Sequence, residues 1–266
     1  MSLFPGGHNE GMLHQDRRRA ESFGADAEQY DRARPGYPSP MVDDLVGDRV
    51  GAAVLDVGCG TGITSRLFAE RGCRVLGVEA DSRMAAVARR SGVDVEEGKF
   101  ESWQDGGRRF DLLVSGQAWH WIEPSSGSAK AAAVLSAGGR VGLFWNHGVQ
   151  DPEAQEELQV VYGRLAPHID EDSILLGSPV ARRIEAAAAG LRASGRFSDP
   201  EVRTFPWRKT YSREEWLDLL PTHSDHRTLP PERLAALLEG VGAVIDELGG
   251  TLDVRYTTWL VSAEVA

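Results

Sequence analysis

The stretch VLDVGCGTG, residues 54–62, decides the fold because an apolar run leads directly into a glycine-rich loop. Residues 52–57 have the composition of a short buried strand, and residues 62–72 have the apolar spacing of a helix. The glycines between them are Gly58, Gly60 and Gly62. A backbone without Cβ atoms turns sharply and approaches a ligand closely, so the pattern predicts a ligand-binding loop.

The alternation of strand and helix continues as far as Asn146. We expect further strands at residues 74–80, 93–100, 110–117 and 140–146, and further helices at residues 82–92 and 129–139. Parallel strands joined by right-handed helical crossovers form a doubly wound sheet, which binds ligands at the carboxyl ends of its strands. The site should therefore lie directly after residues 57, 79, 100, 117 and 145.

The pattern changes after Asn146. Residues 151–199 have helical spacing and predict an inserted cap over the ligand crevice. Late strands are expected at residues 201–212 and 251–264, and helices at residues 212–220 and 230–250. The expected fold class is α/β: a doubly wound, mostly parallel, seven-stranded Rossmann-like sheet with an antiparallel C-terminal edge and a helical cap.

The composition narrows the class of partner. A formal charge of −11 gives no general attraction to phosphate backbones, so we expect no nucleic-acid partner. No apolar run approaches the roughly 18 residues of a membrane span. The N-terminus lacks an apolar signal core, and we expect a cytoplasmic protein with no membrane partner. Cys59 and Cys73 have no CxxC partner, and no metal site is expected.

Two acidic residues narrow the ligand of the glycine loop. Glu79 follows Gly58 by about 20 positions, where a carboxylate can accept hydrogen bonds from both hydroxyls of an adenosine ribose. A dinucleotide loop would read GxGxxG, whereas Ile63 and Thr64 follow the third glycine here. Asp56 would repel a pyrophosphate and suits a cationic ligand. S-adenosylmethionine, which carries an amine and a sulfonium, is such a ligand, and S-adenosylhomocysteine would be its product.

With these residues the sequence resembles the class I S-adenosylmethionine-dependent methyltransferases, whose first motif matches VLDVGCGTG almost letter for letter. Further motifs resemble the small-molecule branch that includes trans-aconitate methyltransferase-like (methyltransferase type 11) proteins. They are ESFGADAEQYDRARPGYP (21–38), GVEADSRMAAVAR (77–89), GKFESW (98–103), FDLLVSGQAWHWIEP (110–124), GGRVGLFWN (138–146) and TYSREEWLDLL (210–220).

The resemblance implies a domain plan. Residues 1–20 would form a flexible tail, and residues 21–266 one methyltransferase domain. That domain would comprise N-terminal lid helices (21–50), a cofactor-binding core (51–147), a helical cap insertion (148–200), and C-terminal strands and helices that complete the sheet (201–266). The sequence does not indicate an oligomeric state.

The resemblance also implies roles in a cofactor site. The three loop glycines would line the methionine moiety, with Asp56 near its amine and Glu79 on the ribose. Met84 would pack near the adenine, and Phe100 and Glu101 would form the adenine edge. The remaining implied cofactor residues are Tyr30, near the sulfonium, Cys59, Thr61, Ala80 and Gln117, which faces the reactive methyl. Because Lys99 and Phe100 stand where related enzymes often have Asp or a small residue, adenine contacts are expected from the backbone.

The acceptor side is open between two chemistries. A carboxylate acceptor needs no base and would favour a cationic clamp such as Arg34, whereas a phenol, hydroxyl or amine would favour a base such as His120. We favour a place in the pocket wall for His120, since aromatic rings near a sulfonium attract cations. The other expected substrate-binding residues are Tyr37, Trp119, Trp121, Trp145 and Asn146. His223 and His226 have a metal-like spacing without a third ligand, and we expect a polar loop there.

The function predicted from these features is methyl transfer from S-adenosylmethionine to a small-molecule acceptor by in-line displacement. One alternative is a non-catalytic S-adenosylmethionine-binding module. A nucleotide-linked oxidoreductase is disfavoured by the loop spacing and by Asp56. A nucleic-acid methyltransferase is disfavoured because GQAWHW (116–121) stands where an NPPY-type tetrad would follow the fourth strand, and because no basic stripe is present.

Overall fold

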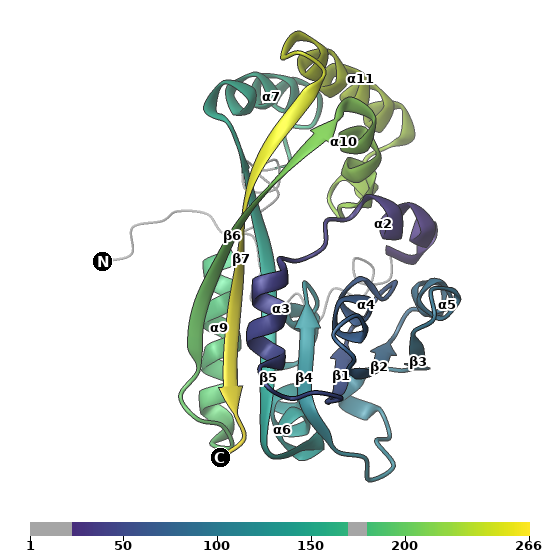
Figure 1. The fold of residues 1–266 in the computed structure, drawn as a ribbon. Helices are drawn as coiled ribbons and strands as arrows, with labels where there is room; N and C mark the ends of the chain where they lie inside the picture. The colour runs from purple at the N-terminus through teal and green to yellow at the C-terminus, as the bar shows by residue number, and fades with distance from the viewer. Residues whose placement is uncertain (1–22, 170–179) are drawn as a thin grey trace.

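The computed structural model describes residues 23–169 and 180–266 (Figure 1). These residues form one seven-stranded sheet in the order β3-β2-β1-β4-β5-β7-β6. The strands are β1 (Ala53–Val57), β2 (Arg74–Glu79), β3 (Asp94–Glu97), β4 (Phe110–Gly116), β5 (Leu135–Gln150), β6 (Glu201–Ser212) and β7 (Thr251–Glu264). Strands β1 to β5 pair in parallel, whereas β7 lies antiparallel between β5 and β6. The expected fold class, including its antiparallel C-terminal edge, is confirmed.

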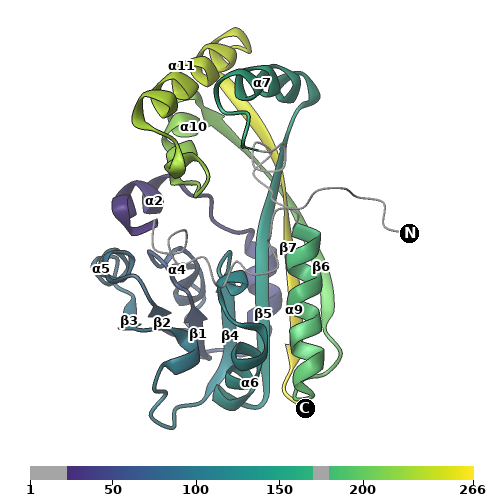
Figure 2. The same ribbon diagram turned by 180° about the vertical axis from the view of Figure 1, so that it is seen from behind.

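Helices cover both faces of this sheet (Figures 1 and 2). On one face, α3 and α4 pack on the sheet and bury their own apolar side chains, such as Met41, Leu45 and Phe68, against it. On the other face, α6 and α9 pack over Leu143, Trp145 and neighbouring residues. The helices of the described residues that belong to the body of the fold are α2 (Ala27–Ala33), α3 (Ser39–Val46), α4 (Ile63–Ala69), α5 (Ser82–Arg90), α6 (Pro124–Val134) and α9 (Val180–Ser194), with 3-10 turns η2 (Phe23–Asp26), η3 (Phe100–Ser102) and η4 (Trp119–Trp121).

The three longest strands extend beyond the rest of the sheet and carry a second group of helices (Figure 1). We call this group the helical lobe: α7 (Pro152–Leu165), α10 (Arg213–Leu219), η5 (Leu220–Thr222), η6 (His226–Thr228) and α11 (Pro231–Glu247). Its core is a separate apolar cluster that includes Tyr162, Trp216 and Ile245. Helix α2 lies between the lobe and the helices at the ends of β1 and β2, as Figure 1 shows.

Local sequence explains where these elements begin. Asp26 caps α2 by accepting a hydrogen bond from the Gln29 amide. Ser212 and Glu215 form a reciprocal capping box at the start of α10. Residues Val54 to Val57 of β1 are fully buried, because helices cover a parallel sheet on both of its faces.

Several expected boundaries and one expected element differ in the structure. The strand predicted at 140–146 spans Leu135–Gln150. The helix predicted at 129–139 ends at Val134, because Leu135 is extended and Gly138 adopts a positive φ of 70°. The strand predicted to reach residue 100 ends at Glu97. Of the helical segment predicted at 151–199, α7 joins the lobe, whereas α9 lies against α6 and the sheet, not over the crevice. The tail predicted at 1–20, and residues 170–179 of the expected cap, lie outside the described residues.

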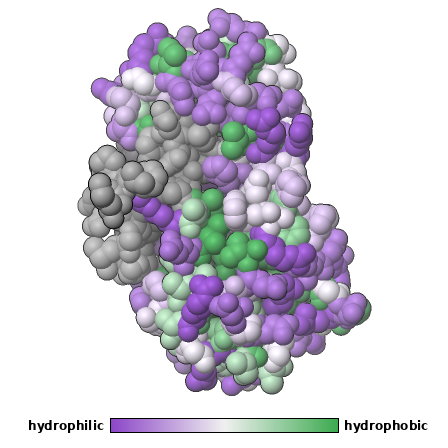
Figure 3. Space-filling model, turned by 90° about the vertical axis from the view of Figure 1, so that its left-hand side faces the viewer, coloured by the Kyte–Doolittle hydropathy of each residue, from purple (hydrophilic) through white to green (hydrophobic). Residues whose placement is uncertain are grey.

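Hydrophilic residues cover much of the face seen in Figure 3. The large hydrophobic side chains exposed among the described residues, Val50, Val160 and Val202, belong to separate parts of the chain. None of the helices in residues 23–169 and 180–266 is long and apolar enough to cross a bilayer.

Candidate active site

The glycine loop joins β1 to α4 through three left-handed residues. Gly58, Gly60 and Gly62 have φ values of 67°, 57° and 86°, a region that side chains with a Cβ rarely adopt. Space adds a second constraint at Gly58, where a Cβ would lie 2.6 Å from the Cβ of Ala118. The loop therefore needs glycine both for its turn and for its close approach to the end of β4.

Glu79 closes this loop from the end of β2. Its carboxylate accepts hydrogen bonds from the Gly60 and Asp81 amides, both at 2.8 Å. Burial raises the pKa of Glu79, and the backbone N–H groups that it accepts from oppose that rise. Glu79 thus stabilises the conformation of the loop. Its carboxylate lies beside the loop, where the predicted ribose contact would be made.

Asp56 lies beneath the loop and is fully buried. Its Oδ2 accepts a hydrogen bond of 2.6 Å from Ser65, while Oδ1 has no hydrogen-bond partner in the structure. Burial raises the pKa of Asp56 to about 7. The hydrogen bond from Ser65 lowers this pKa, and the nearby charge of Glu79 raises it further. A buried carboxylate oxygen without a donor is costly, and it marks a place where a cation or an N–H group would be stabilised. Ser65 was not among the predicted site residues, since nothing in the spacing of α4 singles it out.

The end of β4 carries backbone strain. Gln117 has a φ of 55°, and it is the one non-glycine residue with positive φ in the described residues. Its amide donates to the Phe144 carbonyl and its side-chain Nε2 to the Asn146 carbonyl, at 2.9 and 3.3 Å. Such outliers persist where the surroundings enforce them, and they concentrate at functional sites. The strain supports the prediction that Gln117 belongs to the site.

A cavity with about 50 Å³ of water-accessible space lies between the glycine loop, the ends of β4 and β5, and the segment after α2. Its lining combines the loop with residues predicted for both the cofactor and the acceptor. The lining residues are Tyr30, Arg34, Pro35, Tyr37, Gly58, Cys59, Gly60, Thr61, Ile63, Thr64, Gly116, Gln117 and Asn146. Gly116 leaves space that a Cβ would take, because that atom would lie 2.7 Å from the hydroxyls of Thr64 and Tyr37.

The segment that follows α2 forms one wall of this cavity. The Arg34 guanidinium lies 5.0 Å from the centre of the Tyr30 ring and donates to the Thr222 carbonyl of the lobe at 2.7 Å. The Tyr37 ring packs edge-on against Phe144, with ring centres 4.7 Å apart. The wall therefore connects the body of the fold to the helical lobe.

Asn146 is held by residues that the sequence did not reveal. Its Nδ2 donates to the Gly36 carbonyl at 2.9 Å, and its Oδ1 accepts from the Thr258 hydroxyl at 2.6 Å. The Thr258 hydroxyl in turn accepts from the Trp207 indole at 2.9 Å. Thr258 and Trp207 come from the two late strands, and only the register of β6, β7 and β5 brings them to Asn146.

The tryptophans predicted for the acceptor pocket do not line this cavity, whereas Tyr37 does. Trp119 is buried in the core beside Phe100, and Trp145 is buried on the sheet face opposite to Asn146. Successive residues of a strand point to opposite faces, so Trp145 and Asn146 cannot share one pocket. His120 Nδ1 accepts a 3.2 Å hydrogen bond from the Trp145 indole, and the His120 ring packs 4.8 Å from that of Trp121.

The residues predicted around the adenine lie beyond the cavity, near the ends of β2 and β3. Met84 is buried, and its methyl group would lie 3.5 Å from a Cβ on Gly60. Phe100 is buried, Ala80 is exposed, and Glu101 accepts a hydrogen bond of 3.0 Å from the Glu123 amide.

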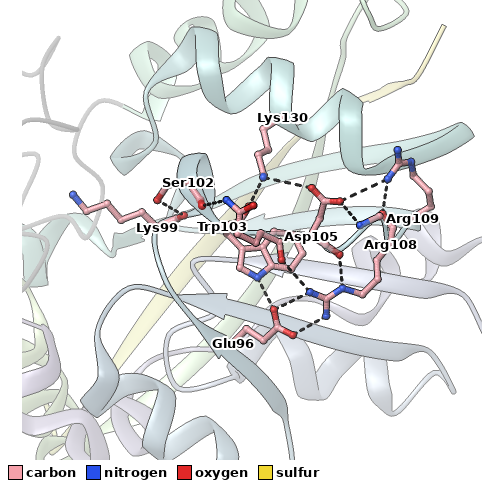
Figure 4. Close-up of polar contacts among 10 residues, drawn as sticks. Glu96, Lys99, Ser102, Trp103, Asp105, Arg108, Arg109 and Lys130 are labelled. Atoms are coloured by element: carbon pink, nitrogen blue, oxygen red, sulfur yellow. Dashed lines mark hydrogen bonds and ion pairs between the residues drawn. The ribbon is translucent and has the colours of Figure 1, made fainter.

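A polar cluster fixes the turn η3 that contains Phe100 and Glu101 (Figure 4). The Trp103 indole donates to Glu96 at 2.6 Å, and Arg108 pairs with the same carboxylate at 2.7 Å. The Arg108 guanidinium also lies 5.0 Å from the centre of the Trp103 ring, and Lys130 donates to the Trp103 carbonyl. The segment expected at the adenine edge is therefore anchored from its far side.

Residues 54–139 match the family model described as a methyltransferase domain. An uncharacterized methyltransferase of Mycobacterium tuberculosis is 34% identical over 145 residues, which cover 54% of this chain and 59% of the relative. A ubiquinone biosynthesis O-methyltransferase of Pseudomonas entomophila is 32% identical over 127 residues, 44% of this chain and 54% of the relative. The chain thus matches less than two thirds of the length of these relatives.

Solved methyltransferase structures share the fold. A protein named as a type II methyltransferase from Anaeromyxobacter dehalogenans has a TM-score of 0.63 at 20% identity, covering 87% of this chain and 97% of that chain. Phosphoethanolamine N-methyltransferase 2 of Haemonchus contortus, solved with S-adenosyl-L-methionine, has a TM-score of 0.52 at 15% identity, covering 98% of this chain and 60% of that chain. Together the comparisons identify a methyltransferase domain at residues 54–139 and a fold shared with solved methyltransferases. The trans-aconitate methyltransferase-like branch stays a prediction.

Proposed function

We propose that this protein transfers a methyl group from S-adenosylmethionine to a small-molecule acceptor. The observation that carries the proposal is the pair of carboxylates at the glycine loop, of which Asp56 is fully buried and Glu79 half-buried. Asp56 has an oxygen without a donor beneath the loop, and Glu79 braces the loop from β2. A phosphate-bearing cofactor would meet uncompensated negative charge there, whereas a cofactor with an ammonium and a sulfonium fits.

The cofactor residues follow from this fit. Asp56 would attract the amine of the methionine moiety, the loop glycines would let that moiety approach the backbone, and Glu79 would accept from the ribose hydroxyls. Tyr30 and Gln117 border the same cavity and would flank the sulfonium. Met84, Ala80, Phe100 and Glu101 remain the proposed adenine side, and Cys59 and Thr61 complete the loop.

The sulfonium supplies the activated methyl group, so the protein's task is alignment and exclusion of water. In this chain the rigid end of β4 at Gln117 and the wall formed by Tyr30 and Arg34 would do this. The acceptor would bind against Arg34, Tyr37 and Asn146, which line the same cavity. His120 is assigned a supporting role, because its Nδ1 is already engaged by Trp145.

The proposal is tested by calorimetric titration of the purified protein with S-adenosylmethionine, S-adenosylhomocysteine and a nicotinamide dinucleotide. We expect micromolar binding of the first two, and none of the third. Binding of the dinucleotide alone would contradict the proposal and revive the oxidoreductase. A panel of carboxylates, phenols and amines, screened for methylation by mass spectrometry, then separates an enzyme from a non-catalytic binding module, which would bind cofactor without turnover.

A further inference from the structure

Two basic side chains at the junction of the cavity wall and the helical lobe have polar atoms without partners. The Nε atom of Arg34 and the Nε2 atom of His223 are buried and make no hydrogen bond in the structure. The Arg34 guanidinium donates to the carbonyl of Thr222, the residue directly before His223. The two side chains therefore lie at one junction, although 188 positions separate Arg34 from Thr222 along the chain.

The charge of Arg34 is not compensated there. Other arginines nearby are paired, since Arg32 binds Asp218 at 2.9 Å and Arg66 binds Asp31 at 2.8 Å. Among the described residues, no acidic side chain lies within ion-pair distance of Arg34. Its guanidinium lies over the Tyr30 ring and lines the cavity, in a place where a bound anion would be stabilised.

The groups around His223 leave its ring neutral. Burial, the most important cause, and the Arg34 charge lower the pKa of His223 well below its usual value. The His226 ring lies 5.8 Å away and also lowers this pKa, while Asp225 raises it. Asp225 is already bonded to His226 Nδ1 at 2.8 Å, and His226 Nε2 to the Tyr162 hydroxyl at 2.7 Å. The predicted polar loop is wrong for His226, which is buried in these contacts.

We propose that Arg34 and His223 together bind an oxyanion, a carboxylate or a phosphate, carried by the methyl acceptor. This inference rests on the proposed function, because Arg34 lines the cavity of that site and His223 directly follows Thr222, whose carbonyl Arg34 contacts. The guanidinium would supply charge and two N–H groups, and the imidazole a further N–H. An anion placed beside His223 would offset the effect of Arg34 on the ring, so anion binding would be accompanied by proton uptake at His223.

The test is calorimetry on protein saturated with S-adenosylhomocysteine, titrated at pH 7 with succinate and, separately, with sulfate as a tetrahedral probe. Repeating each titration in two buffers of different ionisation enthalpy counts the protons taken up. The variants are Arg34→Gln and His223→Gln. The matched controls are Arg192→Gln, an exposed arginine that pairs with Asp199 far from α2, and His168→Gln, an exposed histidine.

We expect at least one probe to bind with proton uptake. Arg34→Gln should weaken binding about tenfold or more, which is about 1.4 kcal/mol, and His223→Gln should abolish the uptake while retaining weakened binding. Preference for succinate or sulfate identifies the oxyanion. Equal affinity in Arg34→Gln, or no binding of either probe to the loaded protein, would overturn the inference, and uptake that persists in His223→Gln would overturn the part assigned to His223. Failure of S-adenosylhomocysteine itself to bind would instead count against the proposed function.

Discussion

At the scale of single residues, Glu79 has two roles: it accepts a hydrogen bond from the glycine loop and, by the proposal, it binds the ribose. One substitution tests whether these roles are specific to Glu79. Glu79→Gln keeps the size of the side chain but removes the negative charge of the carboxylate, which accepts from the Gly60 amide and, by the proposal, from the ribose hydroxyls. We expect S-adenosylhomocysteine affinity to fall about tenfold, or about 1.4 kcal/mol, in calorimetry. Glu97→Gln is the matched control, because Glu97 ends the adjacent strand but pairs with Arg89 on the surface. An equal loss in both variants would contradict a specific role for Glu79.

Gly58 gives a test that does not depend on the ligand. Gly58→Ala imposes a side chain at a φ of 67°, with its Cβ 2.6 Å from that of Ala118. We expect the free energy of unfolding to fall by about 2 kcal/mol or more, measured by urea denaturation. Gly36→Ala should leave stability nearly unchanged, since a Cβ there meets nothing within 4 Å. If the two variants were equally stable, the account of the loop would be wrong.

At the scale of elements, Asp218 joins α2 to the helical lobe. It accepts from Gln29 Nε2 at 2.9 Å and from Arg32 at 2.9 and 3.0 Å. We expect Asp218→Asn to loosen α2, to speed tryptic cleavage near it, and to weaken S-adenosylhomocysteine binding about two- to fivefold, because these groups are partly exposed. Asp199→Asn, which removes an exposed pair with Arg192 far from α2, is the control. Unchanged cleavage in Asp218→Asn would show that other contacts hold α2.

Element boundaries show what the sequence could and could not predict. Periodicity and the glycine loop predicted all seven strands, and the late strands at 201–212 and 251–264 were predicted residue for residue. The end of α6 was missed because the alanines before Leu135 favour a helix, and strand pairing with β4 determines where that helix stops. The loop and its carboxylates are local in sequence and were found from spacing. Thr258, Trp207 and Ser65 were not, since tertiary packing alone brings them to Asn146 and Asp56.

At the scale of the whole molecule, the buried Asp56 links stability, pH and ligand binding. Its pKa in the folded state is about 7, above the usual value of an exposed carboxyl group. The folded state therefore holds a proton that the unfolded chain has already lost. The stability contributed by protonated Asp56 is present below the unfolded pKa, and it is lost as pH rises from about 4 to about 7.

We expect the free energy of unfolding of the wild type to decrease relative to that of Asp56→Asn as pH rises across this window. Urea denaturation at a series of pH values measures it. The subtraction removes the contributions of Glu79 and other carboxylates that both proteins share. A difference that is constant between pH 4 and pH 7 would contradict a raised pKa for Asp56.

The central claim is that Asp56 recognises the amine of S-adenosylmethionine, and one calorimetric comparison tests it most directly. Wild type and Asp56→Asn are each titrated with S-adenosylhomocysteine and with 5′-methylthioadenosine, which keeps the adenosine and lacks the amine. The account predicts that the substitution weakens S-adenosylhomocysteine binding about tenfold or more and leaves 5′-methylthioadenosine binding unchanged. Equal losses for both ligands, or no loss for S-adenosylhomocysteine, would contradict it.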